Sequence, residues 1–189
     1  MSFQLSDRAR ELIPKARIMS FAQWAEHYPP EIIQRFQAAD DGGRYLGADD
    51  FEAIAQHPTP SQHCQLAKRL GEEASELVSQ ARADVLKQFP GITEPNGKLY
   101  PPERAEACWR DFWHFLRCVT YGVASGIVQF TDADGLHYMN LLYQELKVLL
   151  PAMVYGLKVL KNTSIEQSEA ANIAPYFDHL IGKLKQFEA

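Results

Sequence analysis

Residues 100–126, YPPERAEACWRDFWHFLRCVTYGVASG, are predicted to form one long helix around which the rest of the chain is organised. The two prolines at 101–102 suit a helix N-terminus, because the first N–H groups of a helix have no intrahelical acceptor. A thiol, a guanidinium and a carboxylate lie within one turn in the middle of this stretch: Cys108, Arg110 and Asp111. This grouping, surrounded by aromatic residues, is more than a hydrophobic core requires.

The composition indicates one globular domain. The chain has 189 residues, 46% of them hydrophobic, and a formal net charge of −5. That length is enough for a sizeable core. The acidic balance, without any basic stripe, argues against nucleic-acid binding. No apolar run is long enough to span a bilayer, and the N-terminus carries charges where a signal peptide needs an apolar core, so we expect a cytoplasmic protein.

The common catalytic and metal-binding signatures are absent. The three cysteines, Cys64, Cys108 and Cys118, are too few and too scattered for a disulfide framework, and no C-x-x-C pair indicates zinc. Phosphate-binding, dinucleotide-binding, hydrolase and metalloprotease motifs do not occur. We therefore expect no metal site.

Helical periodicity and capping signals predict an all-α fold of about eight helices. Besides the central helix, we expect helices at residues 5–13, 21–38, 47–56, 59–89, 136–150, 151–162 and 164–187. Pro29 and Pro30 favour a division of the second of these. Ser164 with Gln167 resembles a capping box, and Pro175 predicts a kink in the last helix. A globin-like arrangement around the central helix is the expected architecture, and a four-helix bundle is the alternative.

On the central helix, Cys108, Asp111, Phe112 and Phe115 are expected to share one face, with Arg104 one turn earlier. Neighbouring arginines would favour the thiolate form of the cysteine. However, a free cysteine is also a common core residue, and an arginine–aspartate pair is a common surface feature. Spacing alone therefore favours a structural role over a functional one.

Longer motifs favour a functional role for these residues instead. The CWRD motif at 108–111, followed by FLR at 115–117 and VTYG at 119–122, resembles the signature of the phycobiliproteins and is closest to allophycocyanin-type subunits. Three other segments resemble the same family: DDGGRYL at 40–46, NGKLY at 96–100 and YFD at 176–178. The resemblance runs from about Asp40 to near the C-terminus. It implies a globin-like domain at residues 47–189, preceded by an extension with dimerisation helices at residues 1–46.

The resemblance also implies a linear tetrapyrrole (a bilin, with phycocyanobilin as the expected isomer), one per chain, joined by a thioether to Cys108. The carboxylate of Asp111 would accept hydrogen bonds from the central pyrrole N–H groups, and Arg110 would pair with a propionate. To these we add Arg104 as a second propionate partner. Tyr100, Phe112 and Phe115 complete the predicted pocket. The implied function is light harvesting and energy transfer, not enzymatic turnover.

An interface is implied as well. Subunits of this family pair through their N-terminal helices, so Asp40 would face the Arg117 of a partner, with Tyr45 and Tyr121 in the same contact. An intrachain or exposed pair is the alternative. The implied partners are another phycobiliprotein-like subunit or a second copy, in a dimer or a higher ring, and a linker protein. The implied location is the cytoplasmic face of the thylakoid membrane.

The chain also departs from the family pattern. The segment before Asp40 is longer than family subunits usually carry, and Trp109, Trp113 and His114 replace residues that are normally smaller aliphatics or tyrosines. We therefore expect a divergent paralogue. Two alternatives are a pigment-free or photosensory paralogue that acts as an assembly or regulatory protein, and a haem globin. The haem ligand would be one of three histidines: His63, His114 or His137.

Overall fold

The computed structural model describes residues 4–57 and 63–188, and within them the all-α prediction is confirmed. The α-helices are α1 (Asp7–Leu12), α2 (Pro30–Asp41), α3 (Ala48–Ala55), α4 (Cys64–Glu72), α5 (Ala74–Gln88), α6 (Pro102–Ser125), α7 (Ala133–Leu146), α8 (Leu150–Ser168) and α9 (Ala174–Leu184). Two 3-10 helices, Trp24–Glu26 and Ala171–Ile173, add to these. The only β-type pairing in the described ranges is one isolated bridge between Met19 and Thr131.

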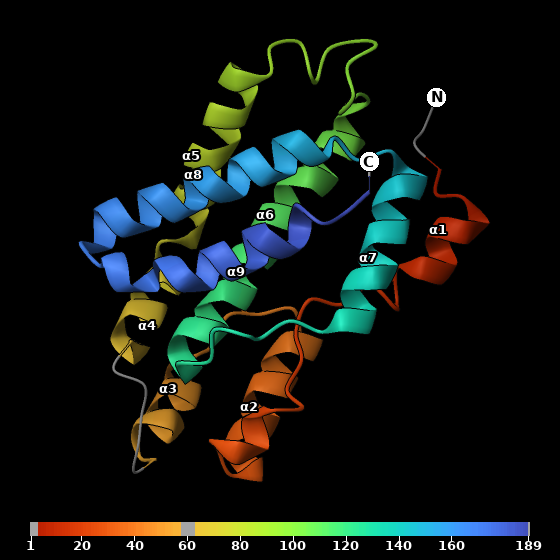
Figure 1. The fold of residues 1–189 in the computed structure, drawn as a ribbon. Helices are drawn as coiled ribbons and strands as arrows, with labels where there is room; N and C mark the ends of the chain where they lie inside the picture. Colours follow the sequence, from red (N-terminus) through yellow and green to blue (C-terminus); the bar gives the residue numbers. More distant parts are fainter. Residues whose placement is uncertain (1–3, 58–62, 189) are drawn as a thin grey trace.

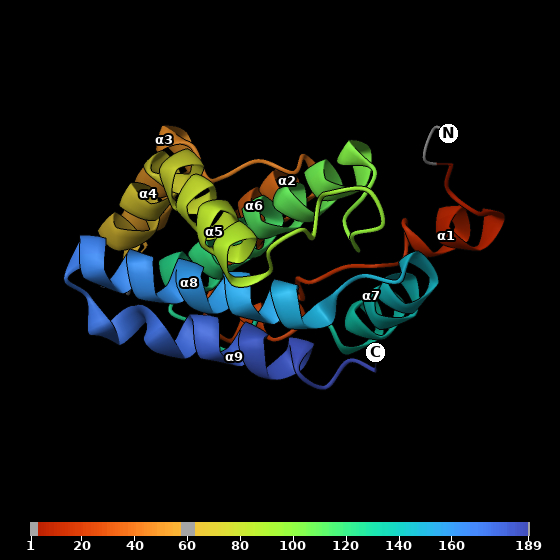
Figure 2. The same ribbon diagram turned by 90° about the horizontal axis from the view of Figure 1, so that it is seen from above.

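The central helix α6 agrees closely with the prediction. It begins at Pro102 and ends at Ser125, and the left-handed φ of 73° at Gly126 terminates the helix. Every residue from Phe115 to Ser125 is buried, because α4, α5, α8 and α9 all pack against α6. Figures 1 and 2 show α8 and α9 as a neighbouring pair along one side of α6. Because several helices pack against α6, its side chains have fixed positions relative to the rest of the fold.

The prediction of a single helix over residues 59–89 is wrong, because this segment is not one continuous helix. Residues 59–62 lie outside the described residues, and the remainder forms two helices that meet at Glu73. Helix α4 packs mainly on α6, whereas α5 packs mainly on α8. No proline marks this change of direction, and the apolar spacing continues through it, so tertiary packing sets the break.

Three further helix predictions can be compared with the structure. The prolines divide the segment predicted as helical over 21–38, as expected: a 3-10 turn at Trp24–Glu26 is followed by α2, which begins at Pro30. The predicted capping box at Ser164 is wrong, because α8 continues to Ser168 and buries Ser164 completely. Pro175 causes no kink, since it lies in the first turn of α9, where a proline loses no hydrogen bond.

Gly156 on α8 gives a test of this packing. A Cβ at Gly156 would overlap the ring of Phe112, which is fully buried on α6. We expect Gly156→Ala to lower the free energy of unfolding by about 1–3 kcal/mol, since neither helix can move away freely. Urea denaturation measures this change. The control is Gly182→Ala on α9, where a Cβ meets open space; that change should be neutral or stabilising, and equal effects of the two variants would contradict the predicted overlap.

Candidate functional site

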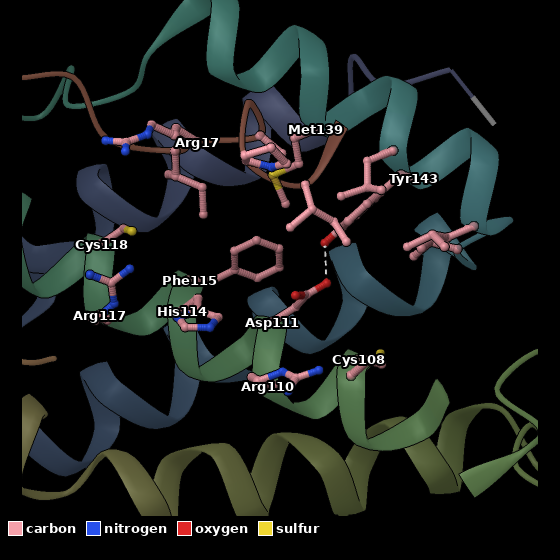
Figure 3. Close-up of a pocket in the computed structure, with 18 of the residues that line it drawn as sticks. Arg17, Cys108, Arg110, Asp111, His114, Phe115, Arg117, Cys118, Met139 and Tyr143 are labelled. Carbon is pink, nitrogen blue, oxygen red and sulfur yellow. Dashed lines mark hydrogen bonds between the residues drawn. The ribbon is translucent and has the colours of Figure 1, made fainter. Parts of the chain in front are cut away.

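A cavity of ≈770 Å³ lies between α6, α7 and the segment that follows α1. Its volume is in the usual range for a small-molecule site. Figure 3 shows Phe115, His114 and Asp111 on the α6 side, with Met139 and Arg17 across from them. Residues of α6 that line the cavity are Glu103, Arg104, Ala107, Cys108, Arg110, Asp111, His114, Phe115, Arg117 and Cys118. The cavity therefore contains most of the chemically distinctive residues of the central helix.

Cys108 is buried at the cavity wall, and its thiol donates to the Sδ of Met153 on α8 at 3.0 Å. Burial raises the pKa of the Cys108 thiol, and the nearby charge of Asp111 raises it further. The prediction that neighbouring arginines favour the thiolate is therefore wrong for the free chain. The closeness of Arg104 and Arg110 to Cys108 in the sequence does not show that the thiol lies in an apolar layer between α6 and α8.

Asp111 is the centre of the polar part of the cavity. The hydroxyl of Tyr143 on α7 donates to its Oδ2 at 2.8 Å (Figure 3). Burial raises the pKa of Asp111 to about 6, although the Tyr143 hydrogen bond and the charge of Arg110 both act to lower it. The carboxyl group is thus held by one donor from the protein and still faces the cavity.

The two arginines that were predicted to bind propionates differ in the structure. Arg110 is exposed at the cavity and makes no hydrogen bond or ion pair with another described residue. Arg104 donates instead to the carbonyl oxygens of Leu146 and Lys147, the latter at 2.8 Å, and so satisfies the C-terminal end of α7. Arg104 lines the cavity, but one terminal nitrogen of its guanidinium is engaged by the end of α7, so the predicted propionate contact would have to use its other nitrogens.

Two predicted pocket residues lie elsewhere. Tyr100 is 46% exposed and does not line the cavity, although Leu99 beside it does. Phe112 is fully buried in the core against Gly156. On a helix with 100° per residue, Phe112 and Asp111 point in directions a quarter-turn apart, so one narrow face cannot hold both. Phe115 does line the cavity, as predicted.

The predicted interface residues come together within this single chain. Arg117 donates to Oδ1 of Asp40 at 2.8 Å and to the hydroxyl of Tyr121 at 2.9 Å. The Tyr121 hydroxyl in turn donates to the carbonyl oxygen of Arg44, and the Tyr45 hydroxyl donates to the carbonyl oxygen of Trp113 at 3.1 Å. The sequence placed the Asp40–Arg117 pair between two subunits, and the structure instead has it inside one chain.

Three features of the site are not among the predicted pocket residues, although His114 was considered as a haem ligand. Tyr143 has no local motif and meets Asp111 only because α7 packs beside α6. His114 lines the cavity with its Nδ1 buried and without a hydrogen-bond partner, and burial lowers its pKa, so the ring is neutral near pH 7. The third is the N-terminal segment, which contributes six of the residues that line the cavity. A lone polar or apolar residue in a helix carries no signal for such contacts.

The other two histidines considered as haem ligands lie outside the lining of this cavity. His63 is buried with its Nε2 2.8 Å from the side-chain nitrogen of Asn172, and His137 is exposed. In the parts of the chain that the structure describes, no group of three His, Cys, Asp or Glu side chains could hold a metal ion. A search of the same residues finds no helix with the length and apolar character needed to cross a membrane.

The raised pKa of Asp111 predicts a pH-dependent stability of the chain without ligand. The unfolded carboxyl titrates near pH 4, so folding favours its neutral form. The stabilisation is therefore complete below about pH 4 and is lost as the pH rises through about 6. We expect Asp111→Asn to be more stable than the natural chain at pH 7.5, by on the order of 2 kcal/mol, and to have no advantage at pH 4.

Urea denaturation of both chains at several pH values measures this difference. Tyr143→Phe is the matched variant, because it removes the donor that lowers the pKa of Asp111 and should move the transition to higher pH. A stability difference between the natural chain and Asp111→Asn that does not change with pH would refute the assignment.

Comparison with known proteins gives consistent matches. A model of the phycobilisome protein family matches residues 34–184. The chain is 33% identical to the allophycocyanin subunit alpha-B of Synechocystis sp. over 154 residues, which is 79% of this chain and 96% of that protein. It is 30% identical to the allophycocyanin alpha chain of Thermosynechococcus vestitus, over 78% of this chain and 94% of that one.

A solved structure has a similar fold. It is a far-red fluorescent biliprotein derived from a far-red induced allophycocyanin F subunit of Chroococcidiopsis thermalis, with a TM-score of 0.60 and 22% identity. The match covers 66% of this chain and 97% of the other. Because the identity is low, this likeness supports the globin-like all-α fold and nothing finer.

Proposed function

Because the chain belongs to the phycobilisome protein family, whose members are light-harvesting proteins and not enzymes, we propose that it carries one linear tetrapyrrole, joined by a thioether to Cys108. The observation that carries this proposal is the cavity beside α6, where Cys108, Asp111 and Arg110 line one wall. A linear tetrapyrrole combines an apolar conjugated body with central N–H groups and two carboxylates. The cavity offers apolar surface, carboxylates that include Asp111 and guanidiniums that include Arg110 to match them.

Each side chain has a distinct role in this proposal. Asp111 accepts hydrogen bonds from the central N–H groups, a charge-assisted contact that is strong in a dry site. Arg110, which has no partner among the described residues, pairs with one carboxylate. Phe115 packs on the conjugated body, and the unpartnered Nδ1 of His114 is the remaining polar contact. When bound, the pigment supplies light absorption, and phycocyanobilin is the isomer we propose.

Assembly and location follow as further parts of the proposal. The relatives are named as allophycocyanin subunits or chains. We propose that this chain, a divergent paralogue, also assembles with another phycobiliprotein-like subunit or with a second copy, and that a linker protein can join them. The proposed place of action is the cytoplasmic face of the thylakoid. Residues 1–46 would serve as an extension of a pigment-binding domain formed by residues 47–189.

Co-expression with enzymes of bilin synthesis tests the proposal. We expect a coloured protein whose band fluoresces with zinc on a denaturing gel. A colourless chain that still forms complexes would contradict the proposal and favour a pigment-free assembly protein. A sharp Soret band, which bilins lack, would indicate a haem protein instead.

A further inference from the structure

The segment from Leu5 to Ile18 forms, together with α7, the side of the cavity opposite α6. We call residues 5–18 the N-terminal wall. Six of its residues line the cavity: Leu5, Ile13, Pro14, Ala16, Arg17 and Ile18. Figures 1 and 2 show α1 beside α7, at the end of the molecule farthest from α3 and α4. The cavity therefore lies between the central helix and a segment that precedes the first long helix in sequence.

Specific contacts hold the N-terminal wall against α7. The backbone of Arg17 donates to the carbonyl of Gly135 at 3.3 Å, and the backbone N–H of Asp132 donates to the carbonyl of Ile18 at 2.8 Å. A Cβ at residue 135 would overlap the Arg17 carbonyl oxygen, so the close approach depends on glycine there. At its other end, the Ser6 hydroxyl donates to Glu145 at 2.6 Å. Both ends of the wall are thus attached to one helix.

A further contact links the wall to α2. The guanidinium of Arg17 lies 3.3 Å from Oδ1 of Asp41, at the end of α2. Both side chains are exposed, so this ion pair contributes little to stability. Together with the backbone bonds to α7, however, it makes the wall bridge α7 and α2, which both contribute residues to the cavity lining.

The exposure of Ile13 indicates that an apolar part of a ligand packs against the N-terminal wall. It is 45% exposed, and only Tyr100 is also a strongly exposed large hydrophobic among the residues that the structure describes. Ile13 lines the cavity next to Pro14, which is also exposed. An apolar surface that faces a cavity containing a carboxylate and a guanidinium is typical of a ligand site.

The N-terminal wall also lies outside the family match, which begins at residue 34. It is therefore a part of the site that the family relationship does not supply. We infer that the N-terminal wall closes the tetrapyrrole site from within the chain, so that a single chain encloses its own pigment. This inference rests on the proposed function. Closure excludes water, which strengthens the polar contacts of Asp111, and restricts the motions by which the excited pigment loses energy as heat.

The test uses the pigment-loaded full chain and three variants. Deletion of residues 1–16 removes most of the wall, and Ile13→Asp places one charge in it without removing any backbone. Arg8→Asp is the matched control, since Arg8 is exposed on α1 and does not line the cavity. In monomeric fractions, we expect the deletion to lower the fluorescence yield roughly threefold or more, with a smaller loss for Ile13→Asp and none for Arg8→Asp.

A second measurement needs no pigment. Cys108 and Cys118 line the same cavity, so the rate at which N-ethylmaleimide alkylates each thiol, resolved by peptide mass spectrometry, reports how closed the cavity is. We expect the deletion to raise at least one of these rates about tenfold, because thiol reactivity follows exposure. Ile13→Asp should raise it less, and Arg8→Asp should not change it.

The outcomes separate the two proposals. A full-length chain that carries no pigment contradicts the proposed function, and the alkylation rates then decide whether the wall closes the cavity. A pigmented chain whose deletion variant keeps its fluorescence yield and its alkylation rates contradicts the inference about the wall alone.

Discussion

Cys108→Ser is expected to abolish the zinc-fluorescent band of the co-expressed protein on a denaturing gel. Only a covalently attached pigment survives denaturation, and Cys108 is the cavity thiol that lies within one helical turn of Asp111 and Arg110. Serine cannot form the thioether, while its small size leaves the packing around α6 nearly unchanged. In native buffer the variant should retain a weaker coloured complex, since its other contacts to the pigment remain.

Cys118→Ser is the matched control, because Cys118 also lines the cavity and is also buried on α6. It should keep the band. A band that persists in Cys108→Ser, or disappears in Cys118→Ser, would contradict the assignment of the attachment site.

The state of the thiol adds a kinetic expectation. Burial and the neighbouring Asp111 raise the pKa of Cys108, so the thiolate is scarce at neutral pH. Since the thiolate is the nucleophile, attachment of free pigment to the purified chain should be slow and should accelerate as the pH rises.

Arg117→Met is expected to lower the free energy of unfolding by about 3–5 kcal/mol, because it leaves the carboxylate of Asp40 buried without its cation. The side chains of Arg117 and Asp40 are only 8% and 13% exposed, and their atoms lie 2.8 Å apart. The same substitution removes the donor to the Tyr121 hydroxyl. Urea denaturation measures the loss. Arg17→Ala breaks the exposed pair with Asp41 and should cost about 1 kcal/mol or less.

Protein concentration distinguishes an intrachain pair from an intersubunit pair. If Arg117 and Asp40 pair within one chain, the loss should be the same at low and high concentration. Sedimentation of Asp40→Ala should then show no shift of a dimer toward monomer beyond that caused by partial unfolding. A loss that appears only where subunits associate would restore the intersubunit contact that the sequence suggested.

Much of the helix pattern could be predicted from local signals. Pro102 and Gly126 bound α6, and Ser6 caps α1 through the backbone N–H of Ala9. The break at Glu73 and the burial of Ser164 could not be predicted, because no proline marks the first and no local pattern marks the second. They follow from the partners that α5 and α8 find in the folded chain.

The candidate site was predictable to a similar degree. Cys108, Arg110, Asp111 and Phe115 share the cavity, as their spacing and the motif suggested. Phe112 lies outside the cavity, because the cavity contacts a narrower part of the α6 surface than the predicted helix face covers. Arg104 lines the cavity, but its guanidinium donates to the carbonyl of Lys147 at the C-terminal end of α7. Local sequence does not indicate this contact.

The sequence by itself determined the all-α class, the central helix and the motifs of the phycobilisome family, because periodicity, caps and motifs depend on residues within a few turns of one another. Only the tertiary structure decided which distant groups meet. Tyr143 reaches Asp111 across 32 positions, and Arg117 reaches Asp40 across 77. The N-terminal wall reaches the cavity through backbone bonds to α7. Such contacts depend on how whole helices pack, and no local pattern encodes that arrangement.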